Sequence, residues 1–399
     1  MAPITFGSAM PAFLPPRTQV SIARFLDHMG FDNLWLADHM AYPDLSPAPD
    51  AWSIIAAMAS STRRMKLGTA VSDPHRMHPA VFAQRLATLD QVSGGRIVLG
   101  LGSGEAMNVE AYGIPWDKPV SRMLESLRVI RGLLSGGEPF TFEGQYFTLR
   151  NARLSVRPYK GRRLPIYLAA LGTRTQAITG HEADGWLPVV IPAQHYAHYL
   201  APVLAGAREA GRDPDEIERV AMVPVALGDN ISFEDVKRLA KPHALSLIWK
   251  PVVERMGIPF DPPAHLRDTH YITVDPMDPE SVRRYHEFQE WIPADMLPPF
   301  VVYGDMAAVK RGLGAYVEAG ATHLYLMNVS PDPIGALVRI ASEIIPYFAR
   351  RRPPLLAQMA RTALPLMEKS GMMGRLLGPM HVRRATQTPV RDSEQVLDI

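Results

Sequence analysis

Short apolar runs of strand length alternate with segments of helical period along most of this chain. Eight such runs occur, at 4–10, 33–38, 66–71, 96–102, 165–171, 185–191, 219–227 and 323–329, and a helical segment follows each one. The runs are apolar throughout, which indicates strands that are buried on both faces, as in a parallel sheet. Eight strand–helix units match a (β/α)8 TIM barrel better than a doubly wound sheet. The sequence therefore predicts an α/β fold of this type.

Two stretches interrupt the repeat, and the end of the chain differs from the rest. Residues 138–165 contain a Gly turn between β-like runs and predict a small β-excursion after the fourth strand. A Pro-rich stretch at about 242–299 predicts an insertion after the seventh strand, suited to a lid or a dimer contact. Beyond about Arg351 the chain is rich in Met and Leu and then polar, which favours a packed amphipathic helix over a membrane anchor. We expect one barrel domain over 1–350 and a C-terminal extension over 351–399.

Composition and motif spacing argue against several functional classes. A formal charge of +2 gives no support for a nucleic-acid partner, and the absence of Cys excludes disulfides and thiolate metal sites. The start of the chain lacks the features of a signal peptide, and no apolar run reaches the roughly 18 residues of a membrane span. HRMH (75–78) is a poor metal site because His78 precedes Pro79 at a helix start. We expect a soluble cytoplasmic protein without a metal, for which a peripheral membrane contact is conceivable.

Polar residues follow four of the predicted strands. They are Asp38 and His39, Ser72 and Asp73, the loop from Gly102 to Asn108, and the loop from Leu171 to Thr175. Because the active site of a (β/α)8 barrel lies at the C-terminal ends of its strands, we expect these groups to meet at one pocket mouth. Taken alone, Asp38 and His39 fit a local capping role as well as a catalytic one.

The loop LGLGSGEAMN (99–108) resembles a dinucleotide-binding glycine loop at first sight. Its third glycine position is held by Glu105, whose carboxylate would face a pyrophosphate, and no strong helix begins before about Ser121. We therefore reject the dinucleotide interpretation. A carboxyl group in an apolar barrel mouth would have its pKa raised by desolvation, which suits a general acid. Glu105 is thus the leading candidate for proton chemistry.

A better phosphate-binding candidate is LGTRTQA (171–177), which follows a strand and opens a helix. Gly172 permits close approach of the backbone, Thr173 can cap the helix, and Arg174 adds positive charge. The free N–H groups of a helix N-terminus bind phosphate readily. An ordinary strand-to-helix loop explains the same residues equally well.

Several segments together resemble the bacterial-luciferase-like superfamily, and within it the branch that uses the deazaflavin coenzyme F420. They are LWLADH (34–39), residues 67–108, GIPWDKPVSRMLESLRVIRGLL (113–134) and IYLAALGTRTQAITGHEADGW (166–186). The resemblance covers about residues 1–350. YGIPWDKPVSRMLESL (112–127), the long insertion, FVVYGDMAAVKRGL (300–313) and GATHLYLMN (320–328) are similar to the mycobacterial phthiodiolone and phenolphthiodiolone ketoreductases.

The resemblance implies a luciferase-like barrel, usually dimeric, with the deazaflavin ring in its mouth. His39 and Glu105 would then be catalytic, Glu105 as the proton donor or acceptor. A non-proline cis peptide is implied at Ala70–Val71, against the back of the ring. The implied cofactor contacts are Asp38, Ala70, Val71, Ser72, Asp73, Gly102, Ser103, Gly104 and Asn108, and, in the phosphate loop, Leu171, Gly172, Thr173, Arg174 and Thr175.

The implied reaction moves a hydride between C5 of the deazaflavin and a carbonyl or alcohol carbon, with a hydrophobic, lipid-like ketone as substrate. AYPD (41–44) replaces the tryptophan of F420-dependent glucose-6-phosphate dehydrogenases, which argues against a sugar phosphate. The Gly104–Glu105 pair favours the deazaflavin over FMN. Two alternatives stay open: an FMN-dependent luciferase-like monooxygenase, and a non-catalytic barrel that binds deazaflavin or lipid.

Overall fold

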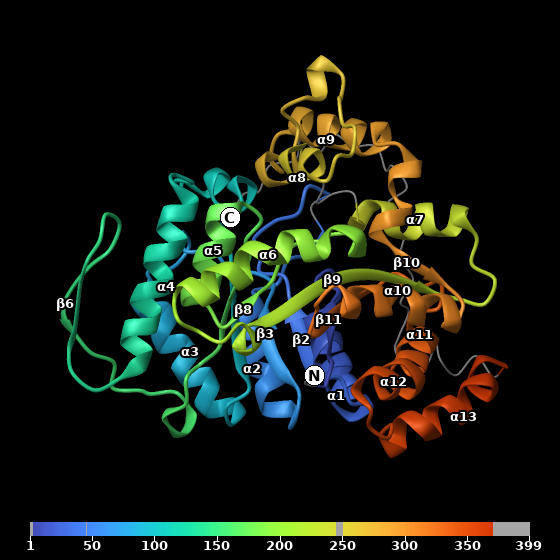
Figure 1. Ribbon diagram of the computed structural model, residues 1–399, viewed down its shortest axis with the longest axis horizontal. Helices are drawn as coiled ribbons and strands as arrows, with labels where there is room; N and C mark the ends of the chain where they lie inside the picture. Colours follow the sequence, from blue (N-terminus) through green and yellow to red (C-terminus); the bar gives the residue numbers. More distant parts are fainter. Residues whose placement is uncertain (1–2, 45, 245–249, 370–399) are drawn as a thin grey trace, which may run out of the picture.

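Eight parallel strands close into a barrel, which confirms the predicted (β/α)8 fold (Figure 1). The computed structural model describes residues 3–44, 46–244 and 250–369. In order around the barrel the strands are β1 (Thr5–Met10), β2 (Asn33–Leu36), β3 (Lys66–Thr69), β4 (Ile97–Leu101), β7 (Ile166–Leu168), β8 (Gly185–Trp186), β9 (Glu218–Leu227) and β11 (His323–Asn328). Pairing of β8 with β9 and of β11 with β1 completes the ring. Each of the eight apolar runs of the sequence contributes one of these strands.

Helices surround the barrel, and one follows each of its eight strands where the sequence predicted it. They are α1 (Pro16–Met29), α2 (Ala51–Ser61), α3 (Pro79–Ser93), α4 (Pro119–Ser135), α5 (Thr173–Glu182), α6 (Ala193–Glu209), α7 (Phe233–Ala244) and α11 (Pro333–Arg339), which leads on to α12 (Ile345–Ala349). A further helix, α10 (Met306–Glu318), was not predicted. Local sequence sets several of their ends. The Asp50 side chain caps α2 by accepting from the Ser53 N–H, and the His78 side chain caps α3, which agrees with its interpretation as a helix start.

The two interruptions also lie where the sequence placed them. β5 (Phe140–Glu143) and β6 (Thr148–Ala152) form an antiparallel hairpin that projects from one edge of the molecule (Figure 1). The second insertion contains α8 (Lys250–Arg255), α9 (Pro279–Trp291) and several short 3-10 turns, and lies at another edge. It is followed by a short strand that we did not predict, β10 (Val302–Gly304), which pairs with the end of β9 outside the ring of eight.

The described part of the C-terminal extension is one helix. α13 (Leu355–Lys369) contacts α1 and α11 and buries Ala357, while Leu355 and Met359 are 71% and 59% exposed. The rest of the Met-rich stretch and the polar tail, from residue 370 onward, lie outside the described residues. Among the helices that the structure describes, none has the length and apolar character needed to cross a membrane.

The interior of the barrel is filled by aromatic side chains around one buried histidine. Trp35 packs against Tyr167, Tyr325 and His323, and all four side chains are at most 5% exposed. The Trp35 Nε1–H group donates to His323 Nε2 over 3.1 Å, so the neutral imidazole carries its proton on Nδ1, 2.7 Å from Thr5 Oγ1. Burial lowers the pKa of His323 from its ordinary value of 6.5 to about 3.

We expect His323 to contribute to acid sensitivity. Because the pKa of His323 is lower in the folded state, its stabilising effect is complete above pH 6.5 and is lost as the pH falls toward about 3. The free energy of unfolding, measured with urea between pH 7 and pH 4, should therefore fall more steeply for the wild-type protein than for His323→Gln. Equal slopes would contradict this assignment.

Candidate active site

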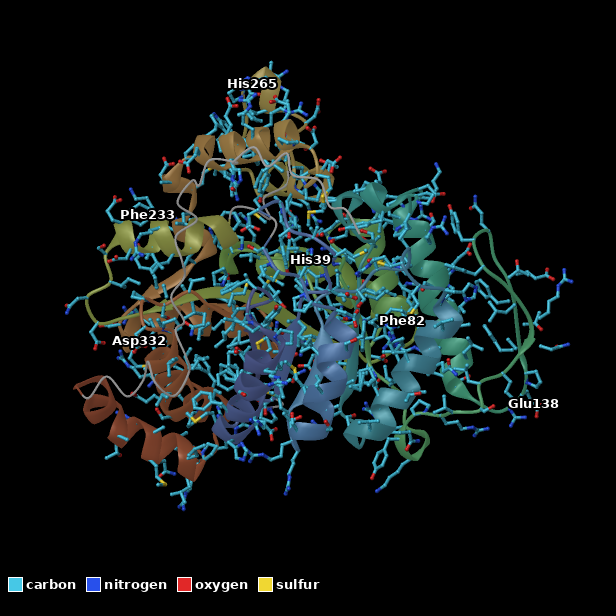
Figure 2. All side chains as sticks on the ribbon, turned by 180° about the vertical axis from the view of Figure 1, so that it is seen from behind. His39, Phe82, Glu138, Phe233, His265 and Asp332 are labelled. Atoms are coloured by element: carbon cyan, nitrogen blue, oxygen red, sulfur yellow. The ribbon has the colours of Figure 1, made fainter. Side chains whose placement is uncertain are left out.

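The loops that follow β2, β3 and β4 meet at the C-terminal rim of the barrel, as predicted. His39 follows β2, Asp73 follows β3 and Glu105 follows β4. Figure 2 shows His39 near the middle of the molecule, and His265, in the insertion, at the top of the same view. The insertion reaches the rim because its 3-10 turn at Tyr271–Thr273 contacts the turn at Ala106–Asn108.

His39, Glu105 and Asn108 form a hydrogen-bonded triangle at this rim. His39 Nδ1 lies 3.2 Å from Glu105 Oε2, and Asn108 Nδ2 lies 2.7 Å from that oxygen and 2.9 Å from His39 Nδ1. The side chains of His39 and Glu105 are only 13% and 25% exposed. The structure thus brings together the two residues that the sequence analysis proposed as catalytic.

Backbone contacts fix the orientation of the Asn108 amide. Its Oδ1 accepts from the N–H groups of Met40, at 2.7 Å, and Ala41, at 3.1 Å, so Nδ2 must face His39 and Glu105. Nδ2 therefore donates to His39 Nδ1, and the neutral imidazole carries its proton on Nε2. Asn108 stays predicted as a cofactor contact; in the structure its amide also holds His39 and Glu105 in place.

Burial keeps both members of the pair uncharged near neutral pH. It raises the pKa of Glu105 from 4.5 to about 8, against the opposing effect of the Asn108 hydrogen bond. It also lowers the pKa of His39 from 6.5 to about 4, and the Arg76 guanidinium acts in the same direction. The site therefore presents a carboxylic acid beside a neutral imidazole, which can release and accept a proton respectively.

Two tyrosines enclose the imidazole. The ring of Tyr42 stacks on His39 with centroids 4.6 Å apart, and the ring of Tyr271 meets it edge-on at 6.1 Å. Tyr42 belongs to the AYPD segment (41–44), which stands where F420-dependent glucose-6-phosphate dehydrogenases carry a tryptophan. The sequence analysis missed Tyr271 because it lies in the Pro-rich insertion, more than 200 residues from His39 and in no recognisable motif.

A buried ion-pair network lies beside His39 and Glu105. Arg76 contacts the carboxylates of Asp38, at 3.1 Å, and Asp73, at 2.5 Å, and donates to the Asp38 carbonyl at 2.8 Å. Asp38 also accepts from the Ser72 hydroxyl, to which Trp52 Nε1 donates over 3.0 Å. Three predicted cofactor contacts, Asp38, Ser72 and Asp73, thus also make hydrogen bonds within the protein. Arg76, which joins the two aspartates, was not predicted.

The glycines of the LGLGSGEAMN loop serve close packing of this loop against the end of β3. The Ala70–Val71 peptide is cis, as the resemblance implied, and a Cβ on Gly102 would overlap the Val71 side chain. Gly104 has a φ of 80°, and a Cβ there would lie 2.8 Å from that of Asp73. These contacts seat the loop so that Glu105 faces His39. The backbone carbonyl of Ser103, between Gly102 and Gly104, accepts a hydrogen bond from His75 Nε2 at 3.1 Å.

The predicted phosphate loop opens α5 at the same rim, because β7 pairs with β4. Gly172, Thr173 and Arg174 are exposed, and no side chain caps the helix at Gly172. The Thr175 hydroxyl donates to the Gly172 carbonyl over 2.8 Å. Among the described residues, no hydrogen bond or ion pair joins Leu171–Thr175 to His39 or Glu105, so the two regions are separate parts of one rim. Within the part of the chain that the structure describes, no cluster of His, Asp and Glu could hold a metal ion.

Comparison with known proteins agrees with this architecture. The family model of luciferase-like monooxygenases matches residues 1–323. The phthiodiolone/phenolphthiodiolone dimycocerosates ketoreductase of Mycobacterium tuberculosis is 31% identical over 353 residues, which cover 81% of this chain and 90% of that protein. An F420-dependent secondary alcohol dehydrogenase, solved with an F420–acetone adduct, superposes with a TM-score of 0.72 at 26% identity, covering 88% of this chain and all of the other.

A second solved structure shows the same fold at lower identity. The F420-dependent tetrahydromethanopterin reductase of Methanopyrus kandleri has a TM-score of 0.72 and 24% identity, and covers 87% of this chain and all of its own. The relatives at higher identity are oxidoreductases by name, as the resemblance implied. The family model spans more than half of this chain, and the ketoreductase is matched over nearly its whole length. The chain belongs to the luciferase-like monooxygenase family.

Proposed function

We propose that this protein is an F420-dependent oxidoreductase that reduces the carbonyl group of a hydrophobic ketone. The observation that carries the proposal is the uncharged Glu105–His39 pair, held by Asn108 at the rim of the barrel. A carboxyl group with a pKa of about 8 retains its proton at neutral pH, yet can lose it during a reaction. The names of the ketoreductase and the alcohol dehydrogenase support the same reaction class.

The residues at the rim suit a flavin-like cofactor with an anionic side chain. The uncapped N-terminus of α5 offers free N–H groups, and Arg174 adds a positive charge beside them. Gln176 in the first turn is fully buried and its Nε2 has no hydrogen-bond partner. This excess of donors over acceptors suits a phosphate group, which would be held by residues from Gly172 to Thr175. When bound, the deazaflavin supplies a hydride at C5.

The protein then controls the substrate oxygen and one proton. His39 Nε2–H can donate to the carbonyl oxygen and polarise it, because Nδ1 is occupied by Asn108. Glu105 supplies the proton that the reduced oxygen needs, either directly or through His39. Tyr42 and Tyr271 exclude water from the imidazole, which maintains the low pKa of His39 and the high pKa of Glu105.

The proposal is tested by cofactor titration followed by a substrate screen. Under anaerobic conditions the protein should bind F420 more tightly than FMN, and should oxidise reduced F420 in the presence of aliphatic ketones of increasing chain length. Tighter binding of FMN, together with oxygen consumption in a parallel aerobic assay with reduced FMN, would instead favour the monooxygenase. Tight F420 binding without hydride transfer to any ketone or from any alcohol would favour a non-catalytic binding protein.

We expect Tyr271 to affect the chemistry through the surroundings of His39 and Glu105. Tyr271→Ala removes a ring that shields the imidazole, so the pKa of Glu105 should fall from about 8 toward its ordinary value of 4.5, and the rate of ketone reduction should decline at a lower pH. Tyr271→Phe preserves the ring and should remain close to wild type. Steady-state kinetics measured as a function of pH show the shift in kcat. A loss of kcat in Tyr271→Phe would show that the hydroxyl takes part in the reaction.

A further inference from the structure

One arginine of the insertion reaches the start of α5. Arg255, the last residue of α8, donates through Nη1 to the carbonyl of Leu171 at 2.8 Å and to Gln176 Oε1 at 3.2 Å. Its guanidinium lies 4.0 Å from the ring centroid of Tyr199 on α6. These contacts place a positive charge from the insertion directly beside the loop that opens α5.

This charge has no acidic partner among the residues that the structure describes. Arg131 and Arg162 are also partly buried, and they pair with Asp184 and Asp90 respectively. Arg255 contacts only a carbonyl, an amide oxygen and an aromatic ring. A partly buried guanidinium without a carboxylate is costly unless other groups or a bound anion compensate it.

Arg96 and Arg255 differ in how many of their N–H donors form hydrogen bonds within the protein. Arg96 also has no carboxylate partner, but its Nε, Nη1 and Nη2 all donate to carbonyl or hydroxyl oxygens. Among the described residues, Arg255 donates through Nη1 alone, and its Nε and Nη2 are not among the buried side-chain atoms that lack a hydrogen-bond partner. These two donors are therefore accessible, and a guanidinium edge of this kind matches the oxygens of a phosphate or carboxylate.

Gln176 gives an independent indication of a ligand at the same place. Its side chain is fully buried, Oε1 is directed toward Arg255, and Nε2 on the same amide has no partner. The neighbouring acidic residue on α8, Glu254, is directed to Lys250 at 3.7 Å. Several donors thus lie together here, at the N-terminus of α5, at Gln176 Nε2 and at Nε and Nη2 of Arg255. Among the described residues, only Arg255 Nη1 has side-chain or loop acceptors at this place, Gln176 Oε1 and the Leu171 carbonyl.

We propose that Arg255 binds the anionic side chain of the cofactor, so that the insertion selects F420 over the uncharged deazaflavin ring system. The proposal rests on the function proposed above and adds a residue from outside the barrel to cofactor recognition. It also explains why α8 is anchored at the start of α5: a cofactor bound there holds the insertion, and with it Tyr271, over the catalytic pair.

The test measures binding and does not depend on turnover. Dissociation constants are measured by fluorescence titration for three ligands: F420, the form that keeps the phosphate but lacks the glutamate tail, and the ring with its ribityl chain alone. Arg255→Gln should weaken F420 binding by roughly ten- to a hundredfold, as expected for a charged hydrogen bond, and should leave the uncharged ligand within about twofold. It should also reduce the dependence of the F420 dissociation constant on salt. Arg255→Lys should lie between the two.

The ligand series and a control variant separate the possible outcomes. An equal loss for F420 and its phosphate-only form assigns Arg255 to the phosphate, and a loss for F420 alone assigns it to the glutamate carboxylates. Arg283→Gln, on the exposed face of α9 where Arg283 pairs with Glu280 at 2.6 Å, should change neither. Equal weakening of all three ligands by Arg255→Gln, or no weakening, would overturn the inference and leave a purely structural role. If the wild-type protein itself does not bind F420, the proposed function fails and this inference fails with it.

Discussion

Replacing Glu105 with Gln is expected to lower the rate of ketone reduction by about 10²–10⁴-fold, the usual contribution of a positioned general acid. The amide is nearly isosteric with the carboxyl group and its oxygen can still accept from Asn108 Nδ2, so the triangle with His39 should persist. What the variant loses is an acidic proton that can be transferred to the substrate. Cofactor affinity should therefore stay within about twofold, which fluorescence titration measures, while kcat falls.

The pH dependence of the same reaction follows from the direction of the Glu105 shift. Because burial raises the pKa of Glu105 to about 8, the acid form predominates below that pH and is lost above it. Ketone reduction should thus be constant around neutrality and fall about tenfold per pH unit above pH 8. Alcohol oxidation requires the carboxylate and should rise up to the same pH. Glu105→Gln should remove the change near pH 8 from the pH dependence of both rates.

Glu110→Gln provides the matched control. Glu110 lies five residues further along the same loop and is exposed, and among the described residues its side chain makes no hydrogen bond or ion pair. The control variant should retain wild-type kcat and the wild-type pH profile. Unchanged turnover in Glu105→Gln would refute the assignment of Glu105 as the proton donor.

The sequence was most informative about strands and helices whose burial is visible in the spacing of their apolar residues. The barrel was predictable because eight continuously apolar runs indicate strands covered on both faces. β10 was missed because a three-residue strand beside a Pro-rich insertion carries no periodic signal. Glu105 and His39 were expected at one pocket mouth because both follow strands of the barrel, whereas their direct contact is visible only in the structure.

The residues that the sequence did not reveal act through distant contacts. Tyr271 and Arg255 reach the rim from an insertion whose course is set by tertiary packing, so neither has a local signature. Arg76 follows Asp73 by only three residues, yet its second partner, Asp38, comes from a different strand. Asn108 was identified from a family resemblance, which could not show that its amide faces the catalytic pair.

The largest effect on stability is expected at Arg76. Removing one partner of a buried ion pair costs about 3–5 kcal/mol, because the remaining charge is left without compensation. Arg76→Gln leaves two such charges, on Asp38 and Asp73, whose side chains are 6% and 5% exposed. The free energy of unfolding at pH 7, measured with guanidinium chloride, should fall by an amount in this range.

A triple variant and the pH dependence of stability distinguish two effects of removing Arg76: the loss of a charge that neutralises the two carboxylates, and the loss of side-chain packing. Burial raises the pKa of Asp38 even in the wild-type protein, and in Arg76→Gln the loss of the guanidinium, which opposes this rise, should raise it further. Folding then takes up protons, and the stability of the variant should approach that of the wild type as the pH falls below about 5. The triple variant Asp38→Asn, Asp73→Asn, Arg76→Gln should recover most of the loss at pH 7. If the triple variant is no more stable than Arg76→Gln, the arginine stabilises the rim through the Asp38 carbonyl and its own packing, and not by neutralising the two carboxylates.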